Sequence, residues 1–162
     1  MANPMANQKT ICMEPIGYVK TSAVGDEVKD RSRTSEIVLK PEFVEALDGV
    51  AEYSHLYVLF WLHEITPEKR LILKIHPRGR ADLPLVGIFA ARTNLRPNPI
   101  GLTIVELLNL KGNVLEVRGL DAFDKTPVLD LKPYDRWGNV ANVAIPAWWE
   151  KLEKEKTNVK SG

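Results

Sequence analysis

The sequence predicts a mainly β protein, a small antiparallel β-barrel with about seven strands and a few short helices. Three observations support this fold class. Short apolar runs are separated by turn-forming residues, a spacing typical of antiparallel barrels and sandwiches. Residues 100–110 and 114–120 flank a Lys-Gly-Asn triplet, which predicts a hairpin with a glycine turn. Only two segments have helical spacing, and the second lies near the C-terminus.

The remaining strands are predicted from their apolar patterns. Residues 54–63, SHLYVLFWLH, are apolar at both alternating sets of positions, which predicts a central strand buried on two sides. Shorter runs predict the other strands, at residues 15–20, 35–39, 70–75, 85–91 and 128–131.

Two helices are expected. The first begins at Pro41, since the first turn of a helix does not use the missing proline N–H, and ends near Gly49. The second follows Pro146, where AWWEKLEKEK places two tryptophans and Leu152 toward the interior.

Length and composition are those of one ordinary domain. The chain has 162 residues, of which 44% are hydrophobic and 27% charged, and a formal net charge of +1. We expect a flexible tail over residues 1–13, a barrel over residues 14–137, and a C-terminal helix and tail over residues 138–162 packed on the same domain. The single cysteine, Cys12, excludes an internal disulfide, and neither a signal peptide nor an apolar membrane span is recognisable. A cytoplasmic protein is therefore expected.

Several common kinds of site are not indicated. The sequence has no glycine-rich loop of the GxGxxG or P-loop type, which argues against a Rossmann-type cofactor site. The histidines His55, His63 and His76 are widely separated, so no bound metal is expected. Arg78 and Arg80 lie in a basic run, residues 69–80, that is either a solvated face or a phosphate contact.

Polar residues at strand ends and in the following loops are further candidates for a ligand site. His63 and Glu64 end the long apolar strand, where loops can meet a ligand, whereas His55 is interpreted as structural. The segment DAFDKTPVLDLKPYDRW carries Asp121 and Asp124 among prolines. These aspartates either stabilise turns or accept hydrogen bonds from ribose hydroxyls.

The stretch RTNLRPNPIGLT, residues 92–103, combines stiffness with positive charge. Two prolines hold the backbone extended, but stiffness alone does not explain Arg92 and Arg96. Guanidinium groups recognise carboxylates and phosphates through paired hydrogen bonds. Arg92 and Arg96 are therefore candidates for binding a carboxylate or a phosphate.

Four ordered blocks of sequence resemble the TsaA-like family, whose best-known members are TrmO-type tRNA methyltransferases. They are IGYVKT, YSHLYVLFWLHE, VGIFAARTNLRPNPIGLTIVEL and GLDAFDKTPVLDLKPY. The resemblance implies a small β-barrel, usually a homodimer, that binds S-adenosyl-L-methionine (SAM) without a Rossmann fold. It also implies a reaction, methylation of the exocyclic amine of threonylcarbamoyladenosine beside the anticodon of tRNA.

The resemblance assigns roles to particular residues. His63, Glu64 or Asp124 is the expected catalytic acceptor of the amine proton. The expected cofactor contacts are Arg33, His63, Glu64, Arg92, Leu102, Asp121, Asp124 and Thr126. The expected substrate contacts are Arg78, Arg80, Arg96 and Asn98. Of the two arginines in the 92–103 stretch, Arg92 is the stronger candidate for cofactor contact, while Arg96 is expected to serve the polar substrate or the carbonyls of its own loop.

Three departures from the family pattern bear on substrate recognition. A shortened loop, SAVGDEVKDRSRTSE, replaces a Pro-Arg-Gln segment, so Arg31 or Arg33 takes its place. Lys125 replaces a glycine, at a cost of about 1 kcal/mol if its φ is positive. One helix replaces a longer C-terminal extension. Two alternatives therefore stay open, a SAM-dependent methyltransferase with another acceptor and a SAM-binding module without catalysis.

Overall fold

The computed structural model describes residues 11–159, and the chain forms two compact units. Unit 1 contains the chain up to Trp61 together with Leu102–Pro133, and unit 2 contains Leu62–Gly101 together with the chain from Tyr134 onward. Residues 1–10 of the predicted tail and residues 160–162 lie outside the described part. The predicted C-terminal segment, residues 138–162, falls in unit 2.

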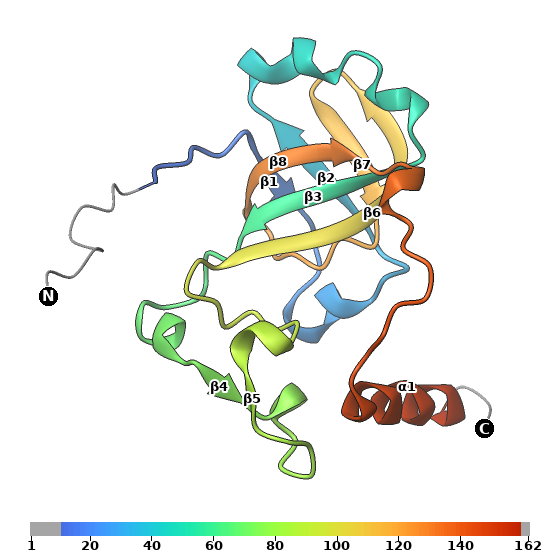
Figure 1. The fold of residues 1–162 in the computed structure, drawn as a ribbon. Coiled ribbons are helices and arrows are strands. Elements are labelled where there is room, and N and C mark those ends of the chain that lie inside the picture. The colour runs from blue at the N-terminus through green and yellow to red at the C-terminus, as the bar shows by residue number, and fades with distance from the viewer. Residues whose placement is uncertain (1–10, 160–162) are drawn as a thin grey trace, which may run out of the picture. The chain divides into compact units, whose positions relative to one another are not determined.

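Unit 1 is built around a closed antiparallel barrel, which confirms the predicted fold class (Figure 1). A closed barrel leaves no strand edge unpaired, which suits a protein with strands this short. Around the barrel the strands follow the order β1 (Gly17–Lys20), β2 (Thr34–Leu39), β7 (Val114–Arg118), β6 (Ile100–Lys111), β3 (His55–Trp61) and β8 (Pro127–Pro133).

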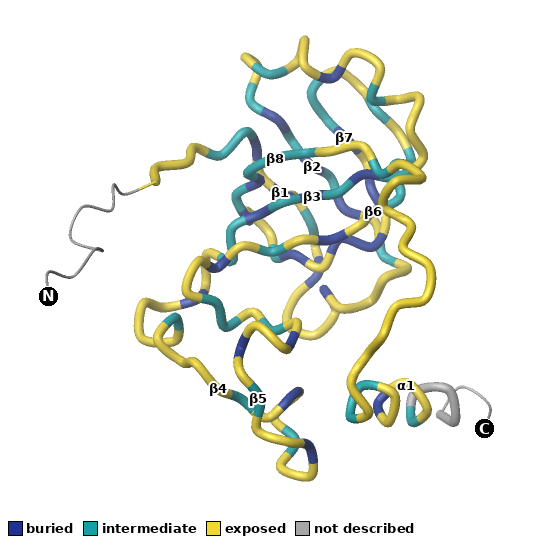
Figure 2. The backbone as a smooth tube through the Cα atoms, in the orientation of Figure 1, coloured by how far each residue is buried: buried dark blue, intermediate teal, exposed yellow. Residues whose placement is uncertain are grey.

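Alternating apolar side chains fill the barrel interior. Ile37, Val58 and Leu115 are fully buried, and buried positions alternate with more exposed ones along most strands (Figure 2). The predicted β6–β7 hairpin is confirmed, with Gly112 at φ 60° in its turn. At Gly17 a Cβ would lie 2.4 Å from the Val38 carbonyl oxygen, so β1 and β2 pair at this position only because it is glycine.

The prediction for β3 was wrong in one respect, because the strand is buried on one face only. Leu56, Val58 and Phe60 are at most 3% exposed, whereas the alternate positions are only half-buried. Those outward positions include Tyr57 and Trp61, whose apolar surface made both faces look alike in the sequence.

Residues 70–75 and 85–91 do not form barrel strands, which corrects the prediction for both. Their apolar side chains do not alternate between buried and exposed positions, and Leu71 and Phe89 are about four-fifths exposed. A separate two-stranded sheet in unit 2 joins only two residues from each run, β4 (Lys74–Ile75) and β5 (Val86–Gly87).

The expected first helix is a 3-10 helix, and the second is an α-helix. In α1 (Ala147–Val159) Leu152 is buried, while Trp148 and Trp149 are half-buried and meet edge to face at 5.7 Å. Within residues 11–159, no helix is long and apolar enough to cross a membrane. The 3-10 helices are η1 (Gly25–Lys29), η2 (Pro41–Leu47), η3 (Val50–Glu52), η4 (Glu68–Leu71), η5 (Pro77–Gly79), η6 (Ile88–Ala90) and η7 (Arg136–Gly138).

Candidate functional site

The predicted site residues of unit 1 gather at one end of the barrel. Strands β1, β3 and β7 end there, and β2, β6 and β8 begin there, because neighbouring strands are antiparallel. Arg33 precedes β2, Leu102 lies at the start of β6, and Asp121, Asp124 and Thr126 lie between β7 and β8. We call this end of unit 1 the barrel mouth.

Asp121 is held at the barrel mouth from two sides. The hydroxyl of Thr103 donates a hydrogen bond to Oδ1 of Asp121, and Thr103 itself is only 3% exposed. Arg31 Nη1 lies 3.7 Å from the same oxygen and donates to the carbonyl of Gly119 at 2.6 Å. A buried hydroxyl and a guanidinium therefore orient this half-exposed carboxylate.

Asp124 is held in the turn that leads into β8. Its Oδ1 accepts a hydrogen bond from the backbone N–H of Thr21 at 3.1 Å. Lys125 has φ 60°, which confirms the condition under which lysine is less favourable than glycine here. The backbone N–H of Lys125 donates to the Val19 carbonyl at 2.8 Å, and Val19 donates to the carbonyl of buried Thr126 at 2.9 Å. These bonds fix the turn against β1.

The Lys20 ammonium interacts electrostatically with the Asp124 carboxylate. Lys20 Nζ is 2.8 Å from Oε2 of Glu36, and this hydrogen bond and charge raise the pKa of Lys20, with a smaller contribution from the charge of Asp124. The Lys20 ammonium therefore stays protonated at neutral pH, and the barrel mouth carries both signs of charge.

The shortened loop before β2 is ordered by its own side chains. Arg33 lies 3.7 Å from Glu27 and 3.5 Å from the Ser22 hydroxyl, to which it donates. The Arg33 carbonyl accepts a hydrogen bond from the Gly119 N–H at 3.0 Å. Through this backbone bond and the side chain of Arg31, the loop is tied to the segment that carries Asp121.

The arginine-rich loop of unit 2 is organised around Arg96. Its guanidinium donates to the carbonyl of Ile88 at 2.8 Å and to that of Ala91 at 2.7 Å, so it supports the loop's own carbonyls. Of the two expected roles for Arg96, the structure shows this one. Arg92 follows directly after Ala91 and is exposed.

The same loop is anchored through its prolines. Pro99 is fully buried, and its carbonyl accepts a hydrogen bond from the Leu62 N–H at 2.7 Å. His63 and Glu64 follow Leu62 and are both exposed, as is Asn98. His63, Glu64 and Arg92 all belong to unit 2.

Arg80 belongs to an ion-pair cluster within unit 2. Its guanidinium binds Asp82 at 2.7 Å and also Glu155 of α1, while Lys151 of α1 lies 2.8 Å from Asp82. Hydrogen bonds from Arg80 and Lys151 hold the pKa of Asp82 well below its usual range, and Arg80 lowers that of Glu155. Arg80 thus fastens α1 to its loop.

Arg78 differs from Arg80 in both exposure and backbone. It is exposed and has φ 54°, followed by Gly79 at φ 67°, so the turn presents its side chain outward. Beside it, His76 Nδ1 lies 2.7 Å from the Leu83 carbonyl oxygen. Arg78 is therefore the better of the two candidates for an anion contact.

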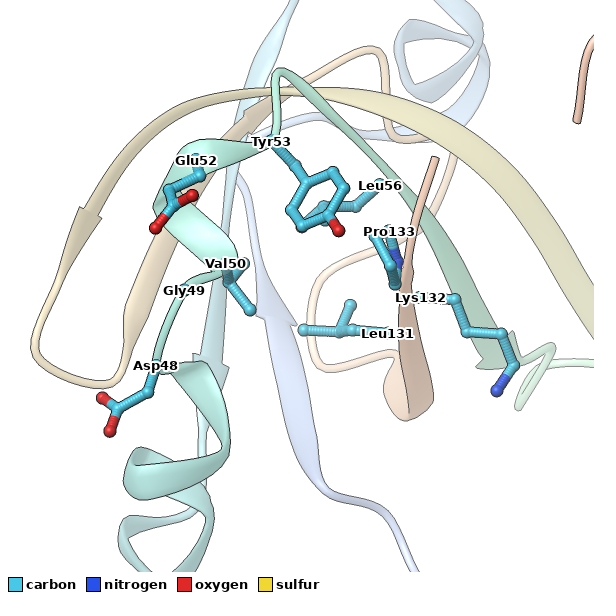
Figure 3. A pocket seen from close by; sticks show the side chains of 9 residues that line it. All are labelled: Asp48, Gly49, Val50, Glu52, Tyr53, Leu56, Leu131, Lys132 and Pro133. Atoms are coloured by element: carbon cyan, nitrogen blue, oxygen red, sulfur yellow. The ribbon is translucent and has the colours of Figure 1, made fainter. Parts of the chain in front are cut away.

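A pocket of about 400 Å³ lies at the end of the barrel opposite the barrel mouth (Figure 3). Val50, Tyr53, Leu131 and Pro133 line it, while the carboxylate of Glu52 points away. None of the predicted site residues lines this pocket. Within residues 11–159, no three His, Cys, Asp or Glu side chains cluster as metal ligands.

Sequence reasoning missed Thr103 as part of the candidate site. It is a hydroxyl residue at an inward position of β6, between the outward-facing Leu102 and Ile104. A buried hydroxyl needs a hydrogen-bond partner, so this position could have been identified as the partner of a nearby acid. The predicted β6–β7 hairpin brings Thr103 near Asp121, but the register that places them opposite each other depends on the bulge between Leu107 and Asn109.

Comparison with known proteins identifies the family to which the chain belongs. Residues 24–137 match the tRNA-methyltransferase O N-terminal domain, and the chain belongs to this family, which confirms the resemblance seen in the sequence. A protein of Methanothermobacter thermautotrophicus described as a probable SAM-binding protein is 42% identical over 129 residues, 76% of this chain and 90% of that one. A SAM-binding protein of Archaeoglobus fulgidus is 35% identical, covering 75% of this chain and 88% of that one.

The fold of the chain is also similar to solved structures of TrmO. The crystal structure of TrmO from Pseudomonas aeruginosa has a TM-score of 0.68 and 31% identity, covering 84% of this chain and 61% of that one. Another crystal structure of TrmO has a TM-score of 0.70 and 29% identity, covering 87% and 63%. The chain therefore spans less than two thirds of the TrmO chains it matches. The predicted cofactor, SAM, is the ligand named in the descriptions of the two archaeal relatives.

Proposed function

We propose that this protein is a SAM-dependent methyltransferase that methylates the exocyclic amine of threonylcarbamoyladenosine beside the anticodon of tRNA. The observation that carries the proposal is the match of residues 24–137 to the tRNA-methyltransferase O N-terminal domain, over the segment that builds the barrel mouth. SAM supplies an electrophilic methyl group on a sulfonium.

The residues of the barrel mouth fit this cofactor. Asp121 and Asp124 are oriented carboxylates that can accept hydrogen bonds from ribose hydroxyls or attract a sulfonium and an ammonium. Leu102, half exposed, offers apolar surface for an adenine ring. We assign Arg92 to the carboxylate of the cofactor, since a guanidinium binds such a group through two hydrogen bonds.

The proposed chemistry is largely positioning. Methyl transfer breaks a C–S bond, forms a C–N bond and releases one amine proton, so two reactants must be held in line and a base must take that proton. His63, Glu64 and Asp124 are the proposed acceptors. Among them Asp124 has an oriented carboxylate, since the Thr21 N–H fixes its Oδ1.

The proposal is tested with SAM labelled in its methyl group and tRNA from cells that lack the homologous enzyme. We expect label in threonylcarbamoyladenosine, and none in tRNA that lacks this nucleoside. Label in another nucleoside or in a small molecule would favour the alternative acceptor. SAM binding with no transfer to any RNA pool would contradict the proposal and favour a binding module without catalysis.

A contact with the RNA backbone is proposed for Arg78. Its exposed, left-handed turn presents a guanidinium without involving the Arg80 cluster. We expect Arg78→Ala to weaken tRNA binding, and to weaken it more at low salt than at high salt. The slope of log affinity against log salt concentration should decrease in magnitude by about 1, the contribution of one phosphate contact. An unchanged slope would remove Arg78 from the interface.

The proposed assembly is a cytoplasmic homodimer. The outer face of β3 and β6 carries Tyr57, Leu59 and Ile104, an apolar surface that a second copy could cover. Sedimentation equilibrium is expected to show a dimer for the wild type and a monomer for Ile104→Glu. A monomeric wild type would contradict this assembly without affecting the assignment of the cofactor.

A further inference from the structure

Trp137 is the most exposed large apolar side chain among residues 11–155. Its exposed fraction is 91%, compared with 80% for Phe89. An indole left in water contributes nothing to a hydrophobic core and forgoes the free energy of burial that a tryptophan usually gains. This exposure singles out the η7 turn, to which Trp137 belongs.

The backbone under Trp137 is nevertheless fixed. The side chain of Asp135 accepts a hydrogen bond from the Trp137 N–H at 2.9 Å. The Gly138 N–H donates to the Asp135 carbonyl at 3.2 Å, and the Asn139 N–H donates to that of Arg136 at the same distance. The turn therefore presents the indole from a formed backbone, so little ordering of the main chain remains to be done on binding.

The residue directly before Trp137 in the η7 turn is a cation, and the exposed apolar residues Val140 and Val143 follow outside the turn. Arg136 precedes it and is exposed, and among residues 11–155 no ion pair of Arg136 is found. The centre of a protein–protein interface is depleted in charged residues, whereas nucleic-acid interfaces are polar and positively charged.

We propose that the η7 turn is an RNA contact, in which an unpaired nucleobase stacks on Trp137 and Arg136 binds an adjacent phosphate. This inference rests on the proposed function, because it assigns a further binding element to the RNA substrate. An aromatic face stacks on any base, and sequence-specific RNA recognition mostly uses unpaired bases that can leave their stack. A guanidinium beside the ring supplies the charge that the phosphate requires.

The test measures the binding of a fluorescein-labelled, unmodified anticodon stem–loop RNA by anisotropy, with a fully paired RNA duplex as a comparison. Trp137→Ala is expected to raise the Kd for the stem–loop about 5- to 150-fold, the range expected for stacking of one base on an aromatic ring. Trp137→Phe, which keeps an aromatic face, should stay within about threefold of the wild type. The matched control Phe89→Ala removes another exposed aromatic ring and should leave the Kd unchanged.

SAM binding and sedimentation, measured on the same variants, distinguish the ways in which the inference could be wrong. Every variant should bind SAM with the affinity of the wild type, which also shows that it is folded. An unchanged stem–loop Kd for Trp137→Ala would overturn the inference while leaving the proposed function intact. A change in sedimentation without a change in Kd would instead identify a protein contact and also overturn it. A wild type that binds SAM but no RNA would reject both the inference and the RNA substrate.

Discussion

Replacing Arg96 with alanine tests how the loop that carries Arg92 is built. The guanidinium donates to two carbonyls, those of Ile88 and Ala91, at 2.8 and 2.7 Å. Both acceptor residues are at most 8% exposed, so water replaces these bonds poorly. A hydrogen bond from a charged donor contributes roughly 1.5–3 kcal/mol, which gives about 3 kcal/mol for the pair after allowing for partial hydration of the half-buried arginine.

The assay is thermal unfolding combined with SAM titration. For a chain of this size, about 3 kcal/mol corresponds to a decrease in Tm of roughly 6–12 °C. Arg96→Lys keeps the charge but cannot bond both carbonyls, so its Tm should fall by about half as much. SAM affinity should decrease in both variants, because the turn that precedes Arg92 loosens. A Tm of Arg96→Ala within about 1 °C of the wild type would refute the structural role of this side chain.

Three further predictions concern other positions. Arg92→Ala should abolish SAM binding and leave Tm nearly unchanged, since the side chain is exposed; calorimetry showing normal affinity would remove Arg92 from the cofactor site. Lys125→Gly should raise the free energy of unfolding by about 1 kcal/mol, measured by denaturant titration, with activity unchanged, because φ is 60° there. The depressed pKa values of Asp82 and Glu155 imply that their ion pairs stabilise unit 2 fully above about pH 5, and that this stabilisation is lost as pH falls below about 4 toward the folded pKa values. Tryptophan fluorescence of the wild type, followed as pH is lowered, should report this acid transition, and the transition should be weaker in Asp82→Asn. Identical pH profiles for the two proteins would contradict a stabilising role for the Asp82 ion pairs.

Much of the barrel could be predicted from the sequence because its signals are local. Strands β1, β2 and β7 alternate buried and exposed residues, and Gly112 marks the β6–β7 turn directly. The β3 faces were misjudged because Tyr57 and Trp61 are apolar yet face outward. Apolar composition shows that a strand is present, but it does not show which face packs inward when both faces are apolar.

Features that depend on distant partners could not be predicted. Arg80 looked like a phosphate ligand because its carboxylate partner on α1, Glu155, is 75 residues away in the sequence. The Thr103–Asp121 hydrogen bond continues the pairing of β6 with β7, whose register shifts at the bulge between Leu107 and Asn109, and the sequence does not show this shift. By contrast, the identities of Asp121 and Asp124 as candidates were accessible, since their motif is contiguous.

The central claim is that the barrel mouth holds the cofactor, and a crystal structure with S-adenosylhomocysteine bound tests it most directly. We predict density for the nucleoside at the barrel mouth, with Asp121 or Asp124 within hydrogen-bonding distance of it. Density only in the pocket beside Tyr53, at the opposite end of the barrel, would contradict the claim.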